Sequence, residues 1–480
     1  MMEQIITKSD ISFNDMEQQL FRQLCKAGCG ILSETLQNID QKIMEERDPG
    51  VYENLGFRAT HVDTIMGRVD FKRREYSYYD EEGQKRYKYL LDDEIHLFNV
   101  GKMSAALIEV VTSQLTVEAY RPAANAVNIM TGITLSHGSI WNITQKLGEV
   151  IREDEDRKTA LHESGEITGK KEVEVLFEEA DGVYLKLQGK DRKRFGKARE
   201  LKVAVTYEGW RKDGKKRFSL AGKRVCSSFE DSKNFKKRKE GMVAYEYNTD
   251  EIKMRIQNGD GAAWIHDLDD ETTISQLDPF HVKRALVKGI QDKPTRKIVE
   301  DLLKRKQIDL ALDVIGALAN SVADEKQQKR INELNAYFSS NKEILIPYRD
   351  RGIALPKLPE GLEYRGMGTM EHHICDVICQ RMKKRKGSWS VSGGANMARI
   401  LSAKMSRTLS DIIRLKLTPA IPERYASIAE VMLSAAKVPL REGKGSDGNI
   451  RHGGMPFRDA YVTNGRKAIQ DMLRVQYSFN

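Results

Sequence analysis

The 480-residue sequence contains no run of about 20 consecutive apolar residues, which is the length that a membrane-spanning helix needs. Its first residues, MMEQIITKSDISF, carry acidic and polar side chains where a signal peptide has a basic start and an apolar run. Only five cysteines are present, an odd number without the spacing of a disulfide framework. We therefore expect a soluble, cytoplasmic protein that makes no contact with a membrane.

The composition is that of a globular protein with several domains. Hydrophobic residues make up 40% and charged residues 31%, which excludes a wholly disordered chain. Domains usually contain about 100 to 200 residues, so a chain of this length should contain more than one. The formal net charge of +9 suits a polyanionic partner, although a mild excess of basic residues is common in other proteins too.

The N-terminal part changes from a helical to a strand pattern. Residues 1–56 form a predicted helical segment, because apolar residues recur at helical spacing over Phe13–Arg47. Residues 57–100 form a predicted β-hairpin region with alternating apolar residues and turns at Met66-Gly67 and Asp80–Gly83. The hairpins carry lysines and arginines among tyrosines, which suits a nucleic-acid surface, and a solvated sheet face explains them equally well.

Residues 101–170 contain a pattern typical of a helix-turn-helix motif. A helical run over Tyr120–Met130 is followed by a short turn with glycine and by a second helical run over Gly138–Leu147. In this motif the second helix enters the major groove, and amide side chains read adenine there. Asn142 and Gln145 are therefore candidate DNA contacts. The alternative is an ordinary pair of packed helices.

A predicted α/β core follows. Residues 171–281 show three strand-like segments, a helix and a fourth strand, the order that opens the ribonuclease H-like fold. Residues 282–350 have an almost entirely helical pattern and are expected to be an all-helical insertion. Residues 351–438 would complete the core, and residues 439–480 form a basic, glycine-rich tail. The predicted fold class is thus a ribonuclease H-like α/β core preceded by a helical and β-hairpin DNA-binding region.

Three acids fall on predicted apolar faces. Asp181 shares the odd-numbered face of its strand with Val175 and Phe177, and Asp260 shares the even-numbered face of a later strand with Ile256. Glu371 begins a helix whose apolar residues recur every three or four positions. A carboxylate in an apolar row is costly unless a partner such as a metal ion compensates its charge.

Carboxylates suit a magnesium site for phosphodiester chemistry. Mg²⁺ prefers hard oxygen ligands from few residues, with water and phosphate completing its shell, and two such ions promote in-line displacement at phosphorus. We therefore expect two Mg²⁺ ions, with Mn²⁺ as a substitute. However, the chain has 70 acidic residues, and an Asp-Gly pair is often only a turn, so the inward positions do not establish a site by themselves.

The motifs around the three acids add a resemblance. The blocks Glu179-Ala180-Asp181-Gly182-Val183, Asn258–Ile265 and Gly366–Glu371 resemble those of the ISLre-type (second group) insertion-sequence transposases, long filed as an uncharacterised protein family. The sequence Asp278-Pro279-Phe280-His281 is similar to the acid-x-x-His motif that follows the second acid in Mutator-type DDE transposases. The resemblance covers most of the chain.

This resemblance implies a DNA transposase that cuts and joins DNA strands. Asp181, Asp260 and Glu371 would be the catalytic metal ligands, with Asp278 and His281 beside them as residues that support the site or position DNA. The partners would be double-stranded DNA and further copies of the chain, and the protein would lie on the nucleoid when bound to DNA.

A basic segment after Glu371 predicts further DNA contacts. Arg381, Lys384 and Arg385 would follow the phosphate backbone, and Trp389 would stack on a base. The alternative is a solvated basic helix end, which the helix dipole favours.

Other interpretations remain at this stage. A transposase-derived DNA-binding protein without catalytic activity and a ribonuclease H-like nuclease or resolvase are the alternative functions. The pairs Cys25 and Cys29, and Cys375 and Cys379, have helical spacing, which favours buried thiols over a zinc site.

Overall fold

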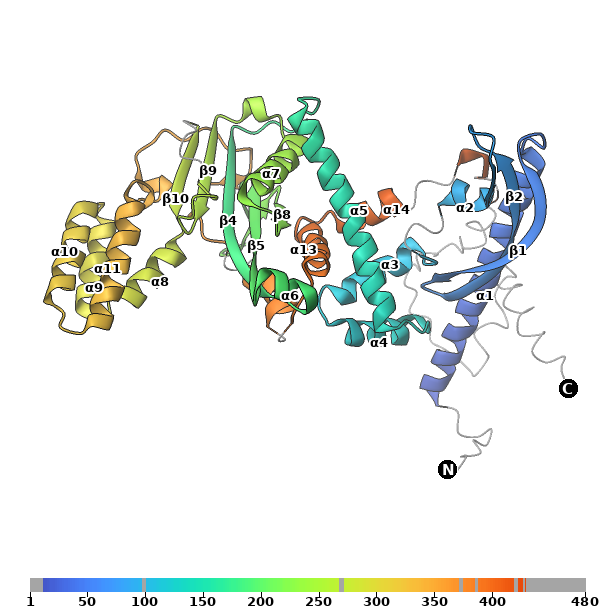
Figure 1. The fold of residues 1–480 in the computed structure, drawn as a ribbon, viewed down its shortest axis with the longest axis horizontal. Helices are drawn as coiled ribbons and strands as arrows, with labels where there is room; N and C mark the ends of the chain where they lie inside the picture. The colour runs from blue at the N-terminus through green and yellow to red at the C-terminus, as the bar shows by residue number, and fades with distance from the viewer. Residues whose placement is uncertain are drawn as a thin grey trace, which may run out of the picture. The chain divides into compact units, whose positions relative to one another are not determined.

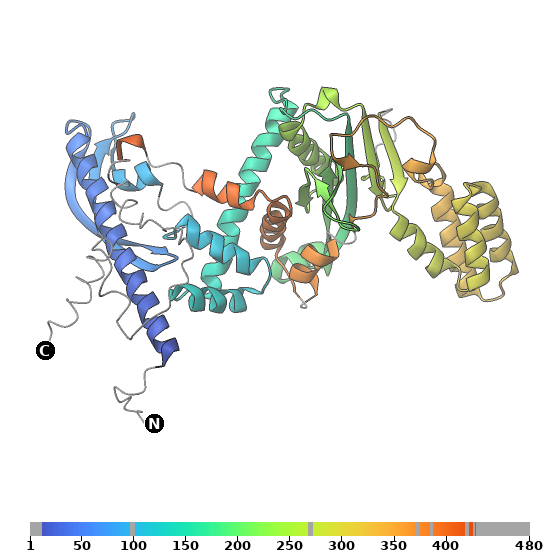
Figure 2. The ribbon, with the colours of Figure 1, turned by 180° about the vertical axis from the view of Figure 1, so that it is seen from behind.

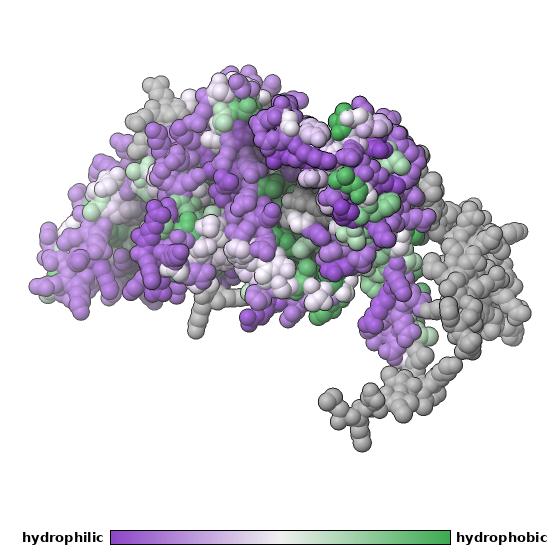
Figure 3. Space-filling model, turned by 45° about the vertical axis from the view of Figure 1, so that its right-hand side comes forward, coloured by the Kyte–Doolittle hydropathy of each residue, from purple (hydrophilic) through white to green (hydrophobic). Residues whose placement is uncertain are grey.

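The computed structural model describes residues 12–96, 101–266, 272–370, 374–384, 387–417, 422–425 and 428. The chain divides into two compact units. The first contains the chain up to Ile108, Asn128–Thr134 and the chain from Leu417, and the second contains Glu109–Val127 and Leu135–Lys416. Within the described ranges no helix is long and apolar enough to cross a membrane. The described surface on the face shown in Figure 3 is mostly hydrophilic.

The first unit joins a long helix to a three-stranded antiparallel sheet. Its elements are α1 (Phe13–Glu46), β1 (Glu53–Thr64), β2 (Gly67–Tyr79), β3 (Lys85–Lys88) and α2 (Leu90–Ile95). A capping box of Ser12 and Asp15 starts α1. Apolar residues in the C-terminal half of α1, such as Ile39 and Ile43, pack against Val69 and Phe71 of β2. The predicted helix and hairpins are thus confirmed.

Further helices link the N-terminal elements to the central sheet. They are α3 (Ala105–Leu115), α4 (Tyr120–Thr131) and α5 (His137–Glu163). Ser136 caps α5, because its hydroxyl oxygen accepts a hydrogen bond from the Ser139 backbone N–H at 3.0 Å. The two helices predicted here are present, but α5 runs well past the predicted end at Leu147 and belongs largely to the packing of the second unit.

The second unit is built on a mixed five-stranded sheet. Its strands are β4 (Val175–Lys186), β5 (Ala198–Tyr207), β8 (Arg224–Ser228), β9 (Met254–Gly259) and β10 (Thr273–Leu277), in the order β10-β9-β4-β5-β8. Strands β4, β5 and β8 are antiparallel, whereas β9 and β10 run parallel to β4. Figure 1 shows β4 in the middle of this sheet. The protein is therefore of the α/β class.

Two details of the sheets differ from the sequence prediction. The third of the three strand-like segments predicted in residues 171–281 covers Arg217–Cys226, and it contains β7 (Phe218–Ala221) and the start of β8, because the chain turns at Gly222 with a φ of +61°. Strand β7 pairs with β6 (Gly209–Lys212), which also pairs with β11 (Leu362–Glu363), in a separate small sheet. The sequence prediction also missed β10, a short strand with only two apolar residues.

Both faces of the first half of β4 are covered, which explains the continuous burial of residues 175–179. Even-numbered Leu176 packs with Val243 and Tyr247 at the end of α7 (Ser232–Glu246). Odd-numbered Phe177 lies on the opposite face, where its ring stacks on that of Tyr207 with centroids 5.3 Å apart. The remaining helices of this part are α6 (Gly189–Phe195), α13 (Val391–Met405) and α14 (Leu409–Leu417).

Four helices extend from the β10 edge of the sheet, as Figures 1 and 2 show from opposite sides. They are α8 (Pro279–Gly289), α9 (Lys293–Lys304), α10 (Ile308–Ser321) and α11 (Glu325–Ser340). Their apolar faces enclose a separate core, to which Leu277 of β10 contributes. The helices predicted over residues 282–350 are confirmed. Short helical turns complete the described chain: η1 (Thr249–Glu251), η2 (Lys342–Ile344), η3 (Tyr348–Asp350), the π-helix η4 (Ile374–Lys383) and η5 (Glu423–Tyr425).

Asp154 on α5 should contribute stability that depends on pH. Burial opposes its ionisation, but Lys158 at 2.6 Å and Arg157 at 2.9 Å outweigh this and lower its pKa to about 2. A lowered carboxyl pKa stabilises the fold above the unfolded pKa of 3.8, and this stability is lost as the pH falls toward 2. Asp154→Asn should thus lower the free energy of unfolding by about 1 to 2 kcal/mol at pH 7.

Urea unfolding of both proteins between pH 7 and pH 3 would test this expectation. The difference between Asp154→Asn and the unaltered chain should shrink at the acidic end. Asp313→Asn, an exposed change on α10, is the control and should show no such trend. A constant difference at every pH would contradict the ion-pair explanation.

Candidate functional site

The pairing of β4 with β9 brings two acids to the same place. Glu179 of β4 lies opposite Asn258 of β9 in a parallel register. Successive side chains of a strand alternate between its faces, so Asp181 and Asp260, each two residues further on, emerge side by side on one face. The expected convergence of these two acids is therefore present.

Local turns hold both carboxylates in place. An oxygen of Asp181 accepts a hydrogen bond from the Gly182 backbone N–H at 2.7 Å, and one of Asp260 accepts from the Ala262 N–H at 2.9 Å. Gly261 has a φ of +92°, and a Cβ there would lie 2.6 Å from the side chain of Asn341. Only glycine fits this turn without strain, so Gly261 fixes the conformation of the backbone directly after Asp260.

His281 completes the group from the first turn of α8. Asp278 caps this helix by accepting hydrogen bonds from the backbone N–H groups of Phe280 and His281. One ligand atom from each of Asp181, Asp260 and His281 lies within 4.8 Å of the others. Within the described ranges, these three residues form the one such cluster of three or more acids, histidines or cysteines.

Charge around His281 favours its protonated form. The neighbouring Asp278 carboxylate raises the pKa of His281, burial lowers it, and Asp181 and Asp260 raise it further. The Nδ1 atom of His281 lies 3.7 Å from an Asp278 oxygen, too far for a direct hydrogen bond. Asp278 is itself buried and accepts a hydrogen bond from Asn258 at 2.7 Å, which ties the start of α8 to β9.

The donor set fits a divalent cation. Two carboxylates supply the hard oxygen ligands that Mg²⁺ and Mn²⁺ prefer, and an imidazole nitrogen is a ligand that first-row transition metals also accept. Glu371, the third expected ligand, and Arg385 lie outside the described residues. Thr369, two positions before Glu371, is described and hydrogen-bonds to Glu179 of β4.

Two of the four expected DNA contacts after Glu371, Arg381 and Trp389, are wrong. The side chain of Arg381 is buried, with its Nε donating to the Leu115 carbonyl and its guanidinium 5.4 Å from the centre of the Trp389 ring. Trp389 is also buried and donates its indole N–H to the Met382 carbonyl at 2.9 Å. These two residues form a packing cluster with Tyr120, so neither can meet a DNA strand. Lys384 is exposed, as expected.

The two amides of α5 differ in their surroundings. Asn142 is exposed, as a residue that reads a base must be. The oxygen of Gln145 instead accepts a hydrogen bond from the Asn396 amide of α13 at 2.9 Å. Gln145 therefore serves helix packing in this structure, which overturns its assignment as a base contact.

Several hairpin arginines are also engaged within the protein. Arg74 pairs with buried Asp40 of α1 at 2.7 Å, and Arg73 pairs with Asp92 at 2.7 Å. These two arginines anchor the sheet to α1 and α2. The sequence alone does not distinguish arginines with this structural role from arginines that bind nucleic acid. Exposed Lys72 and Arg86 stay candidates for that surface.

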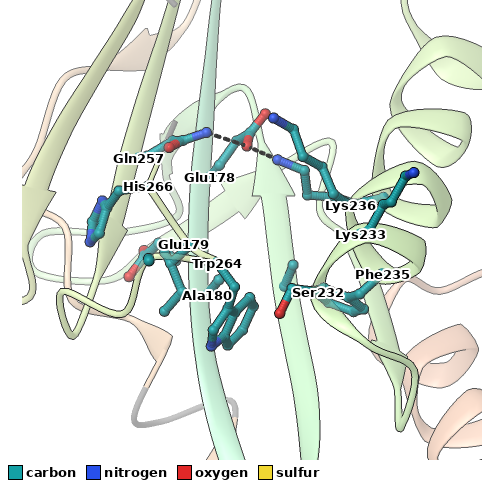
Figure 4. A pocket seen from close by; sticks show the side chains of 14 residues that line it. Glu178, Glu179, Ala180, Ser232, Lys233, Phe235, Lys236, Gln257, Trp264 and His266 are labelled. Carbon is teal, nitrogen blue, oxygen red and sulfur yellow. Dashed lines mark hydrogen bonds and ion pairs between the residues drawn. The ribbon is translucent and has the colours of Figure 1, made fainter. Parts of the chain in front are cut away.

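A pocket of about 330 Å³ lies on the α7 side of the sheet, next to the strands that carry the acids. Figure 4 shows Lys233 and Lys236 on its helix side and His266 on the opposite side. Glu178 accepts hydrogen bonds there from Lys239 and, at 3.4 Å, from Gln257. Burial lowers the pKa of His266 to about 4, so this histidine is neutral at pH 7. Asp181 has the same strand parity as Phe177, on the face opposite to α7, and neither Asp181, Asp260 nor His281 lines this pocket.

Comparison with known proteins places the chain in a family. The sequence model described as "Uncharacterised protein family (UPF0236)" matches residues 6–416. The chain belongs to this family. A UPF0236 protein of Streptococcus gallolyticus, named as lying "in vanSb 3'region", is 24% identical over 414 residues, which cover 83% of this chain and 84% of that protein.

Other UPF0236 relatives come from Caldanaerobacter subterraneus subsp. tengcongensis. One is 22% identical over 427 residues, 83% of each chain, and its name joins eleven locus designations. Another is 21% identical over 388 residues, 78% of this chain and 74% of the relative, and its name joins four.

Proposed function

We propose that this UPF0236 protein is a DDE-type DNA transposase of an insertion sequence, which cleaves DNA strands and transfers them to a target. The observation that carries the proposal is the meeting of Asp181, Asp260 and His281 at the ends of two parallel strands. Asp181, Asp260 and Glu371 would be the catalytic ligands. When bound, two Mg²⁺ or Mn²⁺ ions would activate the attacking oxygen and stabilise the leaving one.

The order of the strands supports a ribonuclease H-like core. Three antiparallel strands, β8-β5-β4, continue into the parallel strands β9 and β10, and α7 lies between β8 and β9 in the chain. This arrangement agrees with the strand, strand, strand, helix, strand succession expected for that fold. The four helices α8–α11, which have their own core, would then be the helical insertion of the second unit.

The residues around the acids have distinct roles in this proposal. Asp278 orients the first turn of α8, so that His281 faces the two aspartates and can contact them or a DNA phosphate. Lys233 and Lys236 of α7 and Lys384, all of them exposed, would contact phosphates. Double-stranded DNA and a second copy of the chain are the proposed partners, in the cytoplasm and on the nucleoid.

The names of the relatives give independent support. One name in Caldanaerobacter subterraneus joins eleven loci and another joins four. A protein carried at many loci of one genome is expected of an element that moves copies of itself. The activity of an ordinary nuclease or resolvase does not copy its own gene to many loci. A DNA-binding protein without catalytic activity would not be able to move its gene either.

The decisive experiment is a cleavage and joining assay. The purified full-length protein is incubated with duplex DNA carrying the ends of its own element and a labelled target, with Mg²⁺ or EDTA. Metal-dependent nicking followed by joining to the target is the expected result. Nicking without joining would favour a nuclease, and binding without nicking would favour a DNA-binding protein without catalytic activity.

Asn142 should contribute sequence preference. Because its exposed amide can pair bidentately with adenine, Asn142→Ala should weaken binding to the element end by about 5- to 150-fold, or about 1 to 3 kcal/mol, and leave binding to random duplex nearly unchanged. Fluorescence anisotropy with both duplexes at one salt concentration measures this. Glu149→Ala, at an exposed position of the same helix, is the control. Equal losses on both duplexes would refute base recognition.

A further inference from the structure

Glu179 is a completely buried carboxylate with an unusually large set of hydrogen-bond donors. Its Oε1 accepts from the hydroxyls of Tyr207 and Thr369, each at 2.7 Å. Its Oε2 accepts from the Asn258 amide at 3.0 Å and from the backbone N–H groups of Gly368 and Thr369 at 3.0 and 2.9 Å. The carboxylate thus joins a neighbouring strand on each side and a distant segment.

The positions of these partners repeat one spacing. Glu179 stands two residues before Asp181, Asn258 two before Asp260, and Thr369 two before Glu371. On the strands, a spacing of two places the residue on the same face as the acid that follows it. One side chain therefore connects the three segments that lead to the three proposed ligands.

Losing the hydrogen bonds to the Glu179 carboxylate would cost free energy, so they hold the three segments rigidly together. A buried carboxylate is unstable unless hydrogen bonds compensate its desolvation. Burial raises the pKa of Glu179, while the hydrogen bonds from Thr369 and Tyr207 oppose this rise. The five donors are hydroxyl and N–H groups, and two of them are the backbone N–H groups of Gly368 and Thr369, so this backbone is held where it satisfies the carboxylate.

We propose that Glu179 is the positioning residue of the site, which holds the segment before Glu371 in register with Asp181 and Asp260. Glu179 would not bind the metal itself, because its two oxygens are taken by five donors. Its effect would pass through Thr369, the one partner that donates to both oxygens. This inference rests on the proposed function, in which the three acids share metal ions.

Two hydroxyl deletions separate positioning from general stability. Thr369→Val removes the donor on the segment before Glu371, whereas Tyr207→Phe removes a donor at the same distance from the same oxygen, but on β5, which carries none of the acids. Mn²⁺ binding to the full-length protein without DNA is measured by titration, with the unfolding midpoint as a second readout. Partners beside metal ligands typically change metal affinity by about 10- to 100-fold.

We expect Thr369→Val to weaken Mn²⁺ binding by about 10-fold and Tyr207→Phe by less than about 3-fold, with similar losses of stability. Glu179→Gln should keep near-normal binding, because its amide can donate to the two hydroxyls while its oxygen accepts from the three N–H groups. Equal effects of the two hydroxyl deletions would overturn the inference. A loss in Glu179→Gln as large as that in Thr369→Val would overturn it too, because charge rather than position would then matter.

Mn²⁺ titration of the variants, together with the DNA cleavage assay of the unaltered protein, distinguishes this inference from the proposed function. If the unaltered protein binds Mn²⁺ and Thr369→Val weakens it, but no DNA is cleaved, the transposase proposal fails and the positioning role stands. If the unaltered protein cleaves DNA while the variants bind Mn²⁺ equally well, the positioning role fails alone. Absence of Mn²⁺ binding in the unaltered protein overturns the positioning role.

Discussion

Replacing Asp260 with asparagine should reduce metal-dependent DNA cleavage by about a thousandfold or more. Asparagine keeps the size of the side chain and an oxygen that can accept the Ala262 N–H, so the turn should persist. It removes the negative charge that a divalent ion needs, and the metal contributes several kcal/mol of charge stabilisation in the transition state. Cleavage and strand transfer should both fall to background, because they use the same ligands.

The folded state should tolerate this change. Without metal, neighbouring carboxylates repel each other, so removing one charge should raise the stability of the metal-free protein slightly. Stabilisation by added Mn²⁺ should shrink, because a weaker ligand shifts the unfolding equilibrium less. DNA binding should persist, since the basic residues proposed to contact DNA are not ligands of the metal.

A matched control makes the Asp260 experiment decisive. Asp213→Asn changes an exposed aspartate of the β6–β7 turn and should retain normal cleavage. Purified Asp260→Asn with a normal melting curve and unimpaired cleavage would remove Asp260 from the mechanism. The transposase proposal would then lose the observation that carries it.

Replacing Glu155 with alanine should destabilise the second unit by about 3 to 5 kcal/mol. Glu155 of α5 is half-buried, and one of its oxygens accepts hydrogen bonds from Arg399 of α13 at 3.1 Å and Arg238 of α7 at 3.2 Å. Arg238 has other acidic partners, including Glu230 at 2.7 Å. Arg399 is buried, and among the described residues it forms an ion pair with Glu155 and donates a longer hydrogen bond to the Asn396 side chain at 3.4 Å. The variant would leave this charge buried without an acidic partner.

Urea unfolding followed by tryptophan fluorescence tests the Glu155 expectation. Glu163→Ala is the control, because it removes an exposed ion pair with Lys237 at the end of the same helix and should change stability little. The double variant Glu155→Ala with Arg399→Met should recover part of the loss, since it removes the stranded charge. No recovery would show that packing, rather than the buried charge, causes the effect.

Side-chain periodicity did not show whether the basic segment after Glu371 is exposed to DNA or buried in the protein. The basic segment around Arg381 and Trp389 has the composition of a DNA contact, yet both side chains are buried against Leu115 and Tyr120, more than 250 positions away in the chain. A sequence shows that a side chain is charged or aromatic. It does not show which distant segment supplies the carbonyl or ring that receives it, so burial of an arginine has no local signal.

The parallel pairing of β4 and β9 was likewise beyond local inference. Alternation put Asp181 and Asp260 on apolar faces, but the register that sets Glu179 beside Asn258 joins strands about 80 residues apart. The sequence also did not identify Glu179 and Asn258 as residues of the site. Each of them stands two positions before one of the acids, but this shared spacing has a meaning only once the two strands are known to be neighbours.

By itself, the sequence determined the α/β class, the main helices and strands, and the inward direction of Asp181 and Asp260, because these follow from side-chain periodicity within one segment. Only the tertiary structure decided that His281 joins them, that Gln145, Arg381 and Trp389 serve packing, and that Glu179 connects three segments. Such contacts arise when remote segments are brought together. Their energy depends on burial and on hydrogen-bond distances, which no local pattern encodes.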